Sequence, residues 1–557
     1  MNRIYPLAVI ASLIMSANAL AVEPADMILT NAKIYGYENA DAIAIYDGNI
    51  VFVGQAAEAD AYRNKKTELI DLEKAYVMPG FIDNHNHVFE AASEAGSNCE
   101  LNMDASLEEQ IPYLKACSKQ AKSDNWLMGY GFSLDAILSE DNRYTPLEVI
   151  DRIFPKQPVV FMEQTSHSMW VNSAALKLAG ISKNSPEPQG GKILKDEKTG
   201  ELNGILFDNA GDIIMEMAWN SIENKFEQSY KGLMVGLEEA AAHGITTIGD
   251  GRLYWKRGWY DVWQQAEKKG DLTARVSLRP WIYPSDSMAP QLAFLKKVQS
   301  SDKSRLLLVE QVKMYSDGII INGTAKLLAP YLNTYIADQP YGINYIPPHQ
   351  MITWLDALDK IGYSAHIHAI GDGAVRESLN AIEHTRNQGS KKPYTLTHVE
   401  LVDSKDVPRF AKLDVTADFQ VGSDYVAQHD HLWAEAFLGA KRTHSLMNPR
   451  AIFDTGANVT LSSDWNVNDI NPLVGIANSL KMGKTGLPDV HSAIDAYTIN
   501  AAESLGISDI TGSIAVGKSA DFAILERDIT RLSADDIAAT EILMTVLQGD
   551  IVFDAEE

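Results

Sequence analysis

The sequence has little cysteine, a deficit of positive charge and no long apolar run beyond its N-terminal segment. It contains two cysteines in 557 residues, and 48 lysines and arginines stand against 74 aspartates and glutamates, a net charge of −26. A chain this acidic repels phosphate backbones and anionic membrane surfaces, so nucleic-acid binding is excluded first. Apolar residues make up 46% and charged residues 22%, ordinary globular values that also exclude a disordered or fibrous chain.

Low-complexity linkers and tandem repeats are absent as well. At roughly 150 residues per domain, the length fits three or four units, or one large barrel with additions. The sequence is therefore long enough to bury a sizeable apolar core.

Residues 1–21 are typical of a secretion signal. Arg3 precedes an apolar run from Ile4 to Met15, and Ala19-Leu20-Ala21 fits an A-x-A cleavage site. This run is too short to span a bilayer, and no later stretch reaches the roughly 20 apolar residues that a spanning helix needs. We expect an exported, periplasmic protein that begins near Val22 and does not associate with a membrane after cleavage. An ordinary N-terminal strand or helix is the alternative.

Export bears on the two cysteines, because oxidising compartments permit disulfides. Only one pairing exists, Cys99 with Cys117. Between them, Ser106 to Glu109 resembles a capping box, and an apolar stripe with helical spacing over 107–114 continues near Cys117. A buried free thiol is the competing interpretation.

The second half of the sequence alternates helical and strand patterns. Helices are expected over 351–361, 374–388, 405–413 and 491–505, with another from Pro449 to Gly456 after the N-cap Asn448; strands are expected over 363–368, 394–398, 415–420 and 459–462. This alternation indicates parallel βα units. A closed (β/α)₈ TIM-like barrel fits better than an open sheet, because the polar residues fall where the strands end.

The two ends of the sequence differ from this middle. Residues 22–78 and 510–557 are rich in β-branched residues and turn dipeptides, and Asp47-Gly48-Asn49 predicts a hairpin turn. Residues 48–52 and 549–553 are near copies, from which we infer that both ends form one small β-sandwich domain. The barrel then occupies 79–509. The alternation of strands and helices is interrupted within about 88–245, which predicts an inserted subdomain over the barrel mouth.

Candidate metal ligands begin at His85-Asn86-His87, after the apolar stretch from Ala75 to Ile82. Residues i and i+2 of a strand point to the same face, so both imidazoles can reach one ion. Alone, such a pair is more often structural. Four further polar side chains fall near the ends of expected strands: Lys313, His368, His398 and Asp464. This coincidence favours a metal site over a packing role.

Longer motifs surround these residues. They are Pro79–His87 (PGFIDNHNH), Ser166–Ser173 (SHSMWVNS), Val312–Gly318 (VKMYSDG), His366–Asp372 (HIHAIGD), Ser463-Asp464, Asn500–Ala502 and Gly512–Asp521 (GSIAVGKSAD). In this order, over nearly the whole expected mature chain, the sequence resembles the amidohydrolase superfamily. The resemblance is to amidohydrolase family 3, the group that includes N-substituted formamide deformylases.

The resemblance implies a role for each candidate ligand. His85 and His87 would bind the more buried metal, a carboxylated Lys313 would bridge two metals, His368 and His398 would hold the second, and Asp464 would coordinate and transfer protons. A desolvated lysine suits its role because its pKa falls and the amine becomes nucleophilic. A snorkelling surface lysine is the alternative. His366 is expected to lie next to the ligands without binding metal itself, because His368 is the histidine that matches the family's His-Ala-Ile-Gly-Asp.

The resemblance also implies a substrate site. His167 matches a position near the substrate carbonyl or leaving group, and Trp170, Tyr315 and Trp465 would wall an apolar pocket. A structural histidine and core aromatics are the alternatives. The sequence departs from the family at Thr397, Val421 and Trp465, where glutamate, proline and a small residue are usual. Because of these departures, the resemblance does not determine the substrate pocket.

The expected reaction is hydrolysis of a C–N bond in a small-molecule amide, formamide or N-acyl compound. Hydroxide from a metal-bound water of pKa about 7 would attack the carbonyl, and Asp464 would pass the proton to the leaving nitrogen. One or two divalent ions are expected, and histidine and carboxylate ligands suit zinc, with iron, manganese or cobalt as alternatives.

Other functions stay open at this point. A lactone, ester or carbamate would pass through the same tetrahedral intermediate. Deamination would need one metal and no bridging lysine. An exported solute-binding protein on a degenerate barrel is the non-enzymatic alternative, and a phosphate site at 371–373 lacks a nucleotide fingerprint. The oligomeric state also stays open, a homo-oligomer included.

Overall fold

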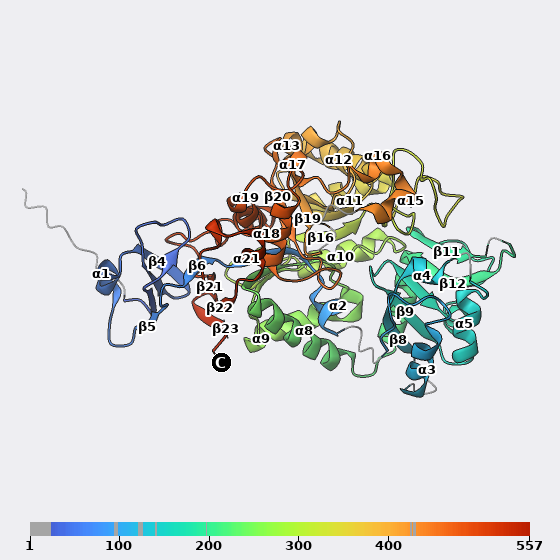
Figure 1. The fold of residues 1–557 in the computed structure, drawn as a ribbon, viewed down its shortest axis with the longest axis horizontal. Coiled ribbons are helices and arrows are strands. Elements are labelled where there is room, and N and C mark those ends of the chain that lie inside the picture. Colours follow the sequence, from blue (N-terminus) through green and yellow to red (C-terminus); the bar gives the residue numbers. More distant parts are fainter. Residues whose placement is uncertain are drawn as a thin grey trace, which may run out of the picture.

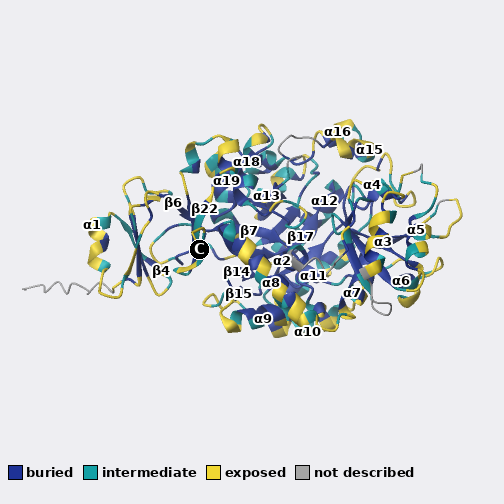
Figure 2. Ribbon diagram, turned by 60° about the horizontal axis from the view of Figure 1, so that its bottom comes forward, coloured by how far each residue is buried: buried dark blue, intermediate teal, exposed yellow. Residues whose placement is uncertain are grey.

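A computed structural model describes residues 24–93, 99–120, 126–139, 142–196, 198–423, 426 and 431–556. The expected signal segment lies outside them. Three parts follow one another along the molecule: a small β-region, a middle body whose strands are buried, and a β-rich insertion (Figures 1 and 2). Among the described residues, no helix is long and apolar enough to cross a membrane.

The middle body contains two parallel sheets. The first has the order β15 (Leu307–Leu308), β14 (Arg275–Ser277), β13 (Ile245–Asp250), β7 (Phe81–Asn86); the second runs β16 (Gln311–Tyr315), β17 (Ser364–Ala369), β18 (Tyr394–His398), β19 (Val415–Gln420), β20 (Val459–Ser462). Two parallel bridges connect the sheets, Asn86 with Trp465 and Trp281 with Lys313. This TIM-barrel-like arrangement confirms the predicted parallel βα units.

Helices alternate with these strands. They are α8 (Lys225–Ala242), α9 (Trp259–Lys269), α10 (Met288–Val298), α11 (Pro348–Lys360), α12 (Asp372–Asn387), α13 (Val407–Leu413), α17 (Pro449–Phe453) and α18 (Pro472–Lys481). The side chain of Asn448 caps α17 by accepting from the Ala451 N–H, as expected. Strands β18, β19 and β20 have the predicted bounds.

The single helix expected over 491–505 is wrong. The segment forms α19 (Val490–Ala496) and α20 (Ile499–Ser504), because Thr498 between them has the non-helical dihedrals φ −133° and ψ −97°. Its hydroxyl donates to the Ile494 carbonyl over 2.8 Å. Such a bond from a threonine side chain to the preceding turn competes with helix continuation.

The small β-region combines both ends of the described chain. One sheet has the order β4 (Asn49–Gly54), β3 (Ala42–Tyr46), β1 (Met27–Thr30), β5 (Glu68–Asp71); the other has β2 (Lys33–Ile34), β6 (Tyr76–Pro79), β21 (Phe522–Leu525), β22 (Ile542–Leu547), β23 (Asp550–Asp554). The antiparallel pair β6 and β21 joins the N-terminal and C-terminal segments. Side chains of both sheets, among them Leu29, Val77 and Phe522, form one apolar cluster.

Turn chemistry explains the hairpin between β3 and β4. Asp47 and Gly48 have φ values of 47° and 71°, which a two-residue turn of type I′ requires and Asp-Gly readily adopts. The near-copy segments do not pair with each other: β4 pairs with β3 and β23 pairs with β22.

The insertion lies between β7 and β13 in the chain. Its sheet has the order β11 (Gly191–Lys195), β12 (Leu202–Asp208), β10 (Ser168–Val171), β9 (Val159–Glu163), β8 (Leu127–Phe132). It also contains α3 (Ile111–Gln120), α5 (Pro146–Ile153), α6 (Ser173–Leu178) and α7 (Asn209–Asn220). A separate apolar cluster stabilises it, built around Phe132, Phe161 and Trp170.

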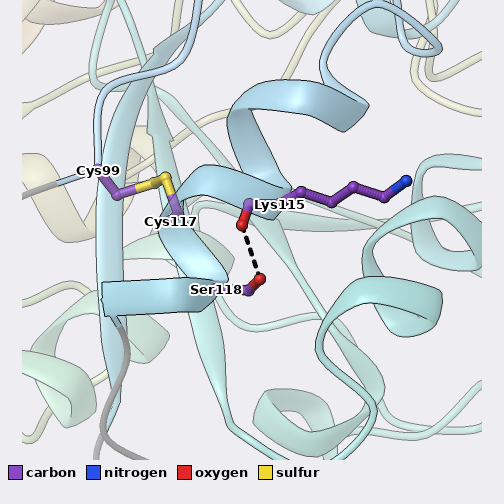
Figure 3. Close-up of a disulfide and its surroundings, with 4 residues drawn as sticks. All are labelled: Cys99, Lys115, Cys117 and Ser118. Atoms are coloured by element: carbon purple, nitrogen blue, oxygen red, sulfur yellow. Dashed lines mark hydrogen bonds between the residues drawn. A yellow bond between two sulfur atoms is a disulfide. The ribbon is translucent and has the colours of Figure 1, made fainter.

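Cys99 and Cys117 form a disulfide within this insertion (Figure 3). Cys117 lies on α3, beside Ser118, whose hydroxyl donates to the Lys115 carbonyl over 2.9 Å. Helix α3 begins later than the capping-box pattern predicts. The Glu109 carboxylate does accept from the Ser106 N–H at 3.0 Å, but in a turn ahead of the helix.

Replacing both cysteines by serine is expected to lower the free energy of unfolding of the insertion by about 3 kcal/mol, because the crosslink restricts the unfolded chain across 18 residues. Urea unfolding of the two proteins measures this difference. Ser118→Ala, on the same helix, should change it by less than about 0.5 kcal/mol. Two free thiols in unreduced native protein would contradict the crosslink.

Candidate active site

The predicted ligands lie on neighbouring strands of the middle body. His85 lies on β7, Lys313 on β16, His368 on β17 and His398 at the end of β18, and Asp464 follows β20. Parallel pairing places Lys313 opposite His366, and Ala369 opposite His398. Because the carboxyl ends of parallel strands meet at one edge, these side chains gather there.

Asp464 is the centre of this group. Its Oδ1 lies 3.1 Å from His85 Nε2 and 3.0 Å from His87 Nε2, and its Oδ2 lies 3.9 Å from His398 Nδ1. Burial opposes ionisation of this carboxyl, but His85 and His87 outweigh it and hold the pKa of Asp464 well below its usual value. A largely buried carboxylate therefore lies among imidazoles.

Lys313 lies beside the same histidine. Its Nζ is 3.2 Å from His85 Nε2 and 3.3 Å from His85 Nδ1, and the residue is fully buried. Burial lowers the pKa of this amine well below its usual value; Asp464 opposes the shift, while Arg252 and Arg279 reinforce it. Because the residue is fully buried, a snorkelling surface lysine is excluded. The lowered pKa favours the neutral, nucleophilic form of the amine.

Buried histidine nitrogens without a hydrogen-bond partner are candidate ligand atoms for a metal ion. His368 Nδ1 and His398 Nε2 are buried and have no hydrogen-bond partner in the part of the chain that the structure describes. The other nitrogen of His368 lies 3.0 Å from the Gly318 carbonyl, an arrangement that leaves Nδ1 to ligate. Burial lowers the pKa of both rings well below the usual value, which keeps them neutral. Neutral imidazoles with a carboxylate fit a divalent ion.

The ligand atoms of His85, His398 and Asp464 all lie within 4.8 Å of one another, as one ion would require. The same holds for His85, His366 and Asp418. His366 Nε2 is 2.7 Å from His85 Nδ1, so the two rings are in contact. The expectation that His366 lies next to the ligands without binding metal stays a prediction, because His366 itself belongs to the second group.

Two candidate ligands have a strained backbone. His398 and Asp464 have φ values of 74° and 56°, in the left-handed region that β-carbon sterics disfavour. Such strain costs about 1–3 kcal/mol per residue and is concentrated at functional sites. The left-handed turn at each position bends the chain just after a strand.

The insertion contributes a second acid–imidazole pair. His167 Nδ1 lies 2.7 Å from Asp208 Oδ1, across the pairing of β10 with β12. The His167 ring centroid is 5.2 Å from that of His368. The insertion therefore holds an oriented histidine beside the metal ligands.

A cavity of about 1030 Å³ lies between the insertion and the middle body. His368, His398 and Asp464 line it from one side, and Gln164 and His167 line it from the other. That the insertion covers the mouth of a closed barrel stays a prediction. Glu400 also lines the cavity; burial raises its pKa to about 7, and Asp464 adds to the shift.

The structure corrects the prediction that Trp170 walls the pocket. Trp170 is fully buried in the core of the insertion, where its indole N–H donates to the Pro146 carbonyl at 3.0 Å. The residues that line the cavity also do not include Tyr315 or Trp465. Tyr315 stacks on His368 at a centroid distance of 4.1 Å and supports it from the core.

Sequence reasoning missed three buried carboxylates. Asp208 orients His167, Glu90 lies 3.5 Å from His87 Nδ1, and Asp418 accepts hydrogen bonds from Thr397, Thr460 and Ser462. Thr416, Asp418 and Gln420 alternate with apolar residues on β19, and this row of polar side chains was a usable signal. Glu90 offered a weaker signal, because it lies only three residues after His87. Asp208 offered none, because its partner His167 is distant in sequence.

Comparison with known proteins agrees with this geometry. Residues 68–553 match the amidohydrolase family. The chain is 27% identical to Protein LONG AFTER FAR-RED 3 of Arabidopsis thaliana, over 94% of this chain and 91% of that protein. It is 24% identical to N-substituted formamide deformylase of Arthrobacter pascens, over 94% and 97%.

The fold is shared with an uncharacterized metal-dependent hydrolase from Pyrococcus horikoshii OT3, whose crystal structure has a TM-score of 0.70. That likeness covers 91% of this chain and 99% of the other, at 21% identity. The family match spans most of the sequence and includes every candidate metal ligand. The chain belongs to the amidohydrolase family, and it is an enzyme of that family.

Proposed function

We propose that this enzyme hydrolyses a C–N bond in an amide, formamide or N-acyl compound, with divalent metal held by His85, His87, Lys313, His368, His398 and Asp464. The observation that carries the proposal is the Asp464 carboxylate between two histidines, with the fully buried Lys313 amine beside them. The similarity to N-substituted formamide deformylase supports the substrate class.

A divalent ion in this site would supply a nucleophilic hydroxide near neutral pH and polarise the substrate carbonyl. The ligand set suits zinc. The chain's own residues would do the rest. Asp464 is placed to take a proton from the attacking water and return it to the leaving nitrogen. His167, with Nδ1 engaged by Asp208, is placed to hydrogen-bond the carbonyl oxygen or leaving group through Nε2.

We also infer that Lys313 is carboxylated. Its neutral amine would form a bond to the carbon of CO₂ and release one proton, giving a carbamate with two oxygen donors. Each oxygen could then ligate one ion. Support comes from the burial of Lys313 and from the absence of a bonded carboxylate on its amine among the described residues.

With β15 and β16, which only residues 309–310 separate, counted as one strand, the two parallel sheets support a closed eight-stranded barrel. The two small sheets support a β-sandwich. We infer closure from the two bridges between the parallel sheets and from the backbone bonds Asp464 N–H to His85 O and His87 N–H to Trp465 O, both 2.8 Å. A closed barrel would bring its first and last strands together beneath the metal.

Metal content tests the binuclear site. Protein purified without added metal or chelator is expected to hold about two equivalents per chain, and Lys313→Ala less, because the bridging group is lost. Elemental analysis measures both. Lys303→Ala, which removes a surface ion pair with Asp509, is the matched control and should keep the metal. One equivalent that Lys313→Ala leaves unchanged would point to a mononuclear site and reopen deamination.

His167→Ala is expected to lower kcat by about 10²–10⁴-fold, the size of a general acid–base contribution, while metal content stays at the wild-type value. Asp208→Asn should give a smaller loss, because the imidazole remains but is no longer oriented. Steady-state kinetics on an N-formyl amine measures both, with His243→Ala on the surface as control. Loss of metal in His167→Ala would instead make this histidine a ligand.

We propose that the enzyme is exported. The N-terminal signal pattern and the disulfide support this, because disulfides persist in oxidising compartments. Fractionation of cells that express the full chain should find it in the periplasm, with Val22 as the first residue by N-terminal sequencing. A cytoplasmic protein that retains Met1 would contradict export.

A further inference from the structure

The side chains that line the catalytic cavity include several acids and, among the described residues, no lysine or arginine. Besides Asp464, three acidic side chains line it: Glu100, Asp135 and Glu400. A cavity with one sign of charge discriminates between ligands by their own charge.

Two buried arginines near Lys313 donate their hydrogen bonds to other residues of the protein. Arg252 donates to the Tyr315 hydroxyl and to Glu90, at 3.1 and 3.2 Å. Arg279 donates to the main-chain and side-chain oxygens of Asn84, at 2.6 and 2.7 Å. Neither lines the cavity. A substrate carboxylate would find no guanidinium to pair with.

Glu400 lies near the candidate metal ligands. It is partly buried, follows His398 closely in the chain, and interacts electrostatically with Asp464. Among the described residues, no cation or hydrogen-bond donor contacts its carboxylate, in contrast to the oriented Asp208 and Asp418. Its carboxylate is therefore available to a ligand in the cavity.

Other features mark the same cavity as a ligand site. The unpartnered Nδ1 of His368 belongs to a fully buried residue in its wall. Ile319, Ile320 and Ile321 give it an apolar side, and its volume of about 1030 Å³ suits a substrate much larger than formamide. The net charge of −26 attracts cations over long range.

We propose that the substrate is an N-acyl or N-formyl compound carrying a protonated amine, which Glu400 binds, and that compounds carrying a carboxylate are excluded. This proposal rests on the proposed hydrolysis. An ammonium would pair with Glu400 while the apolar part of the substrate lies against the isoleucines. A carboxylate at the same place would lie beside Glu400, and no lysine or arginine of the described residues lines the cavity to offset that repulsion.

Three matched probes test this charge selectivity: N-formylphenylalanine, its carboxamide, and the analogue in which an aminomethyl group replaces the carboxylate. The scaffold stays the same while the charge changes from negative to neutral to positive. We expect kcat/KM to fall in the order cationic, neutral, anionic, with at least about tenfold between the extremes. In Glu400→Gln, the ratio of kcat/KM for the cationic and neutral probes should fall about tenfold.

Glu227→Gln is the matched control, because Glu227 is an exposed acid on α8 outside the cavity and its loss changes the net charge equally. Its ratio should equal that of the wild type. Equal or faster hydrolysis of the anionic probe, or an unchanged ratio in Glu400→Gln, would overturn the proposal.

Binding separates this proposal from the proposed reaction. Calorimetry with phenethylamine and with 3-phenylpropionate should detect only the amine, and Glu400→Gln should weaken that binding. If the amine binds selectively but none of the probes is hydrolysed, the proposed reaction fails and the charge selectivity stands. If 3-phenylpropionate binds as tightly as the amine, the charge selectivity fails whatever the reaction.

Discussion

The rest of the site depends on the contacts of the Asp464 carboxylate with His85 and His87. This carboxylate lies about 3 Å from both His85 and His87, and the N–H of Asp464 donates to the His85 carbonyl, so the segment after β20 is fixed to the end of β7. These strands are far apart in the sequence and adjacent in space. A buried carboxylate needs compensation, and the neighbouring imidazoles with a bound cation would provide it. The same contact therefore holds the two sheets together and assembles the proposed metal site.

The surroundings of this carboxylate favour ligand binding over stability. His398 and Asp464 keep left-handed backbone conformations, and buried ring nitrogens lack partners among the described residues. Such costs persist only where the rest of the fold supplies excess stability, here the apolar cores of the middle body and the insertion. The insertion adds His167, oriented by Asp208, to a site whose candidate metal ligands all come from the middle body.

Local patterns predicted the strands well and the pocket poorly. The bounds of β18, β19 and β20 follow from apolar runs between polar turns, and the ligand candidates follow from polar residues at their ends. Family resemblance then assigned the roles. Trp170 was misplaced because an aromatic next to a site motif can point into a core, and its strand partners fix its direction. Asp208 was missed because its role depends on the register of β10 with β12, which no local pattern shows. The break at Thr498 depends on one side-chain bond.

Anomalous X-ray diffraction at metal absorption edges, on crystals of the enzyme as purified, tests the central claim most directly. The proposed binuclear site predicts two anomalous peaks. One should lie within coordination distance of His85 and His87, and the other within coordination distance of His368 and His398. Asp464 should contact the metal, and extra density should extend from the Lys313 amine between the peaks. Crystals without an anomalous peak at this edge of the sheets, in protein that still hydrolyses an amide, would contradict it.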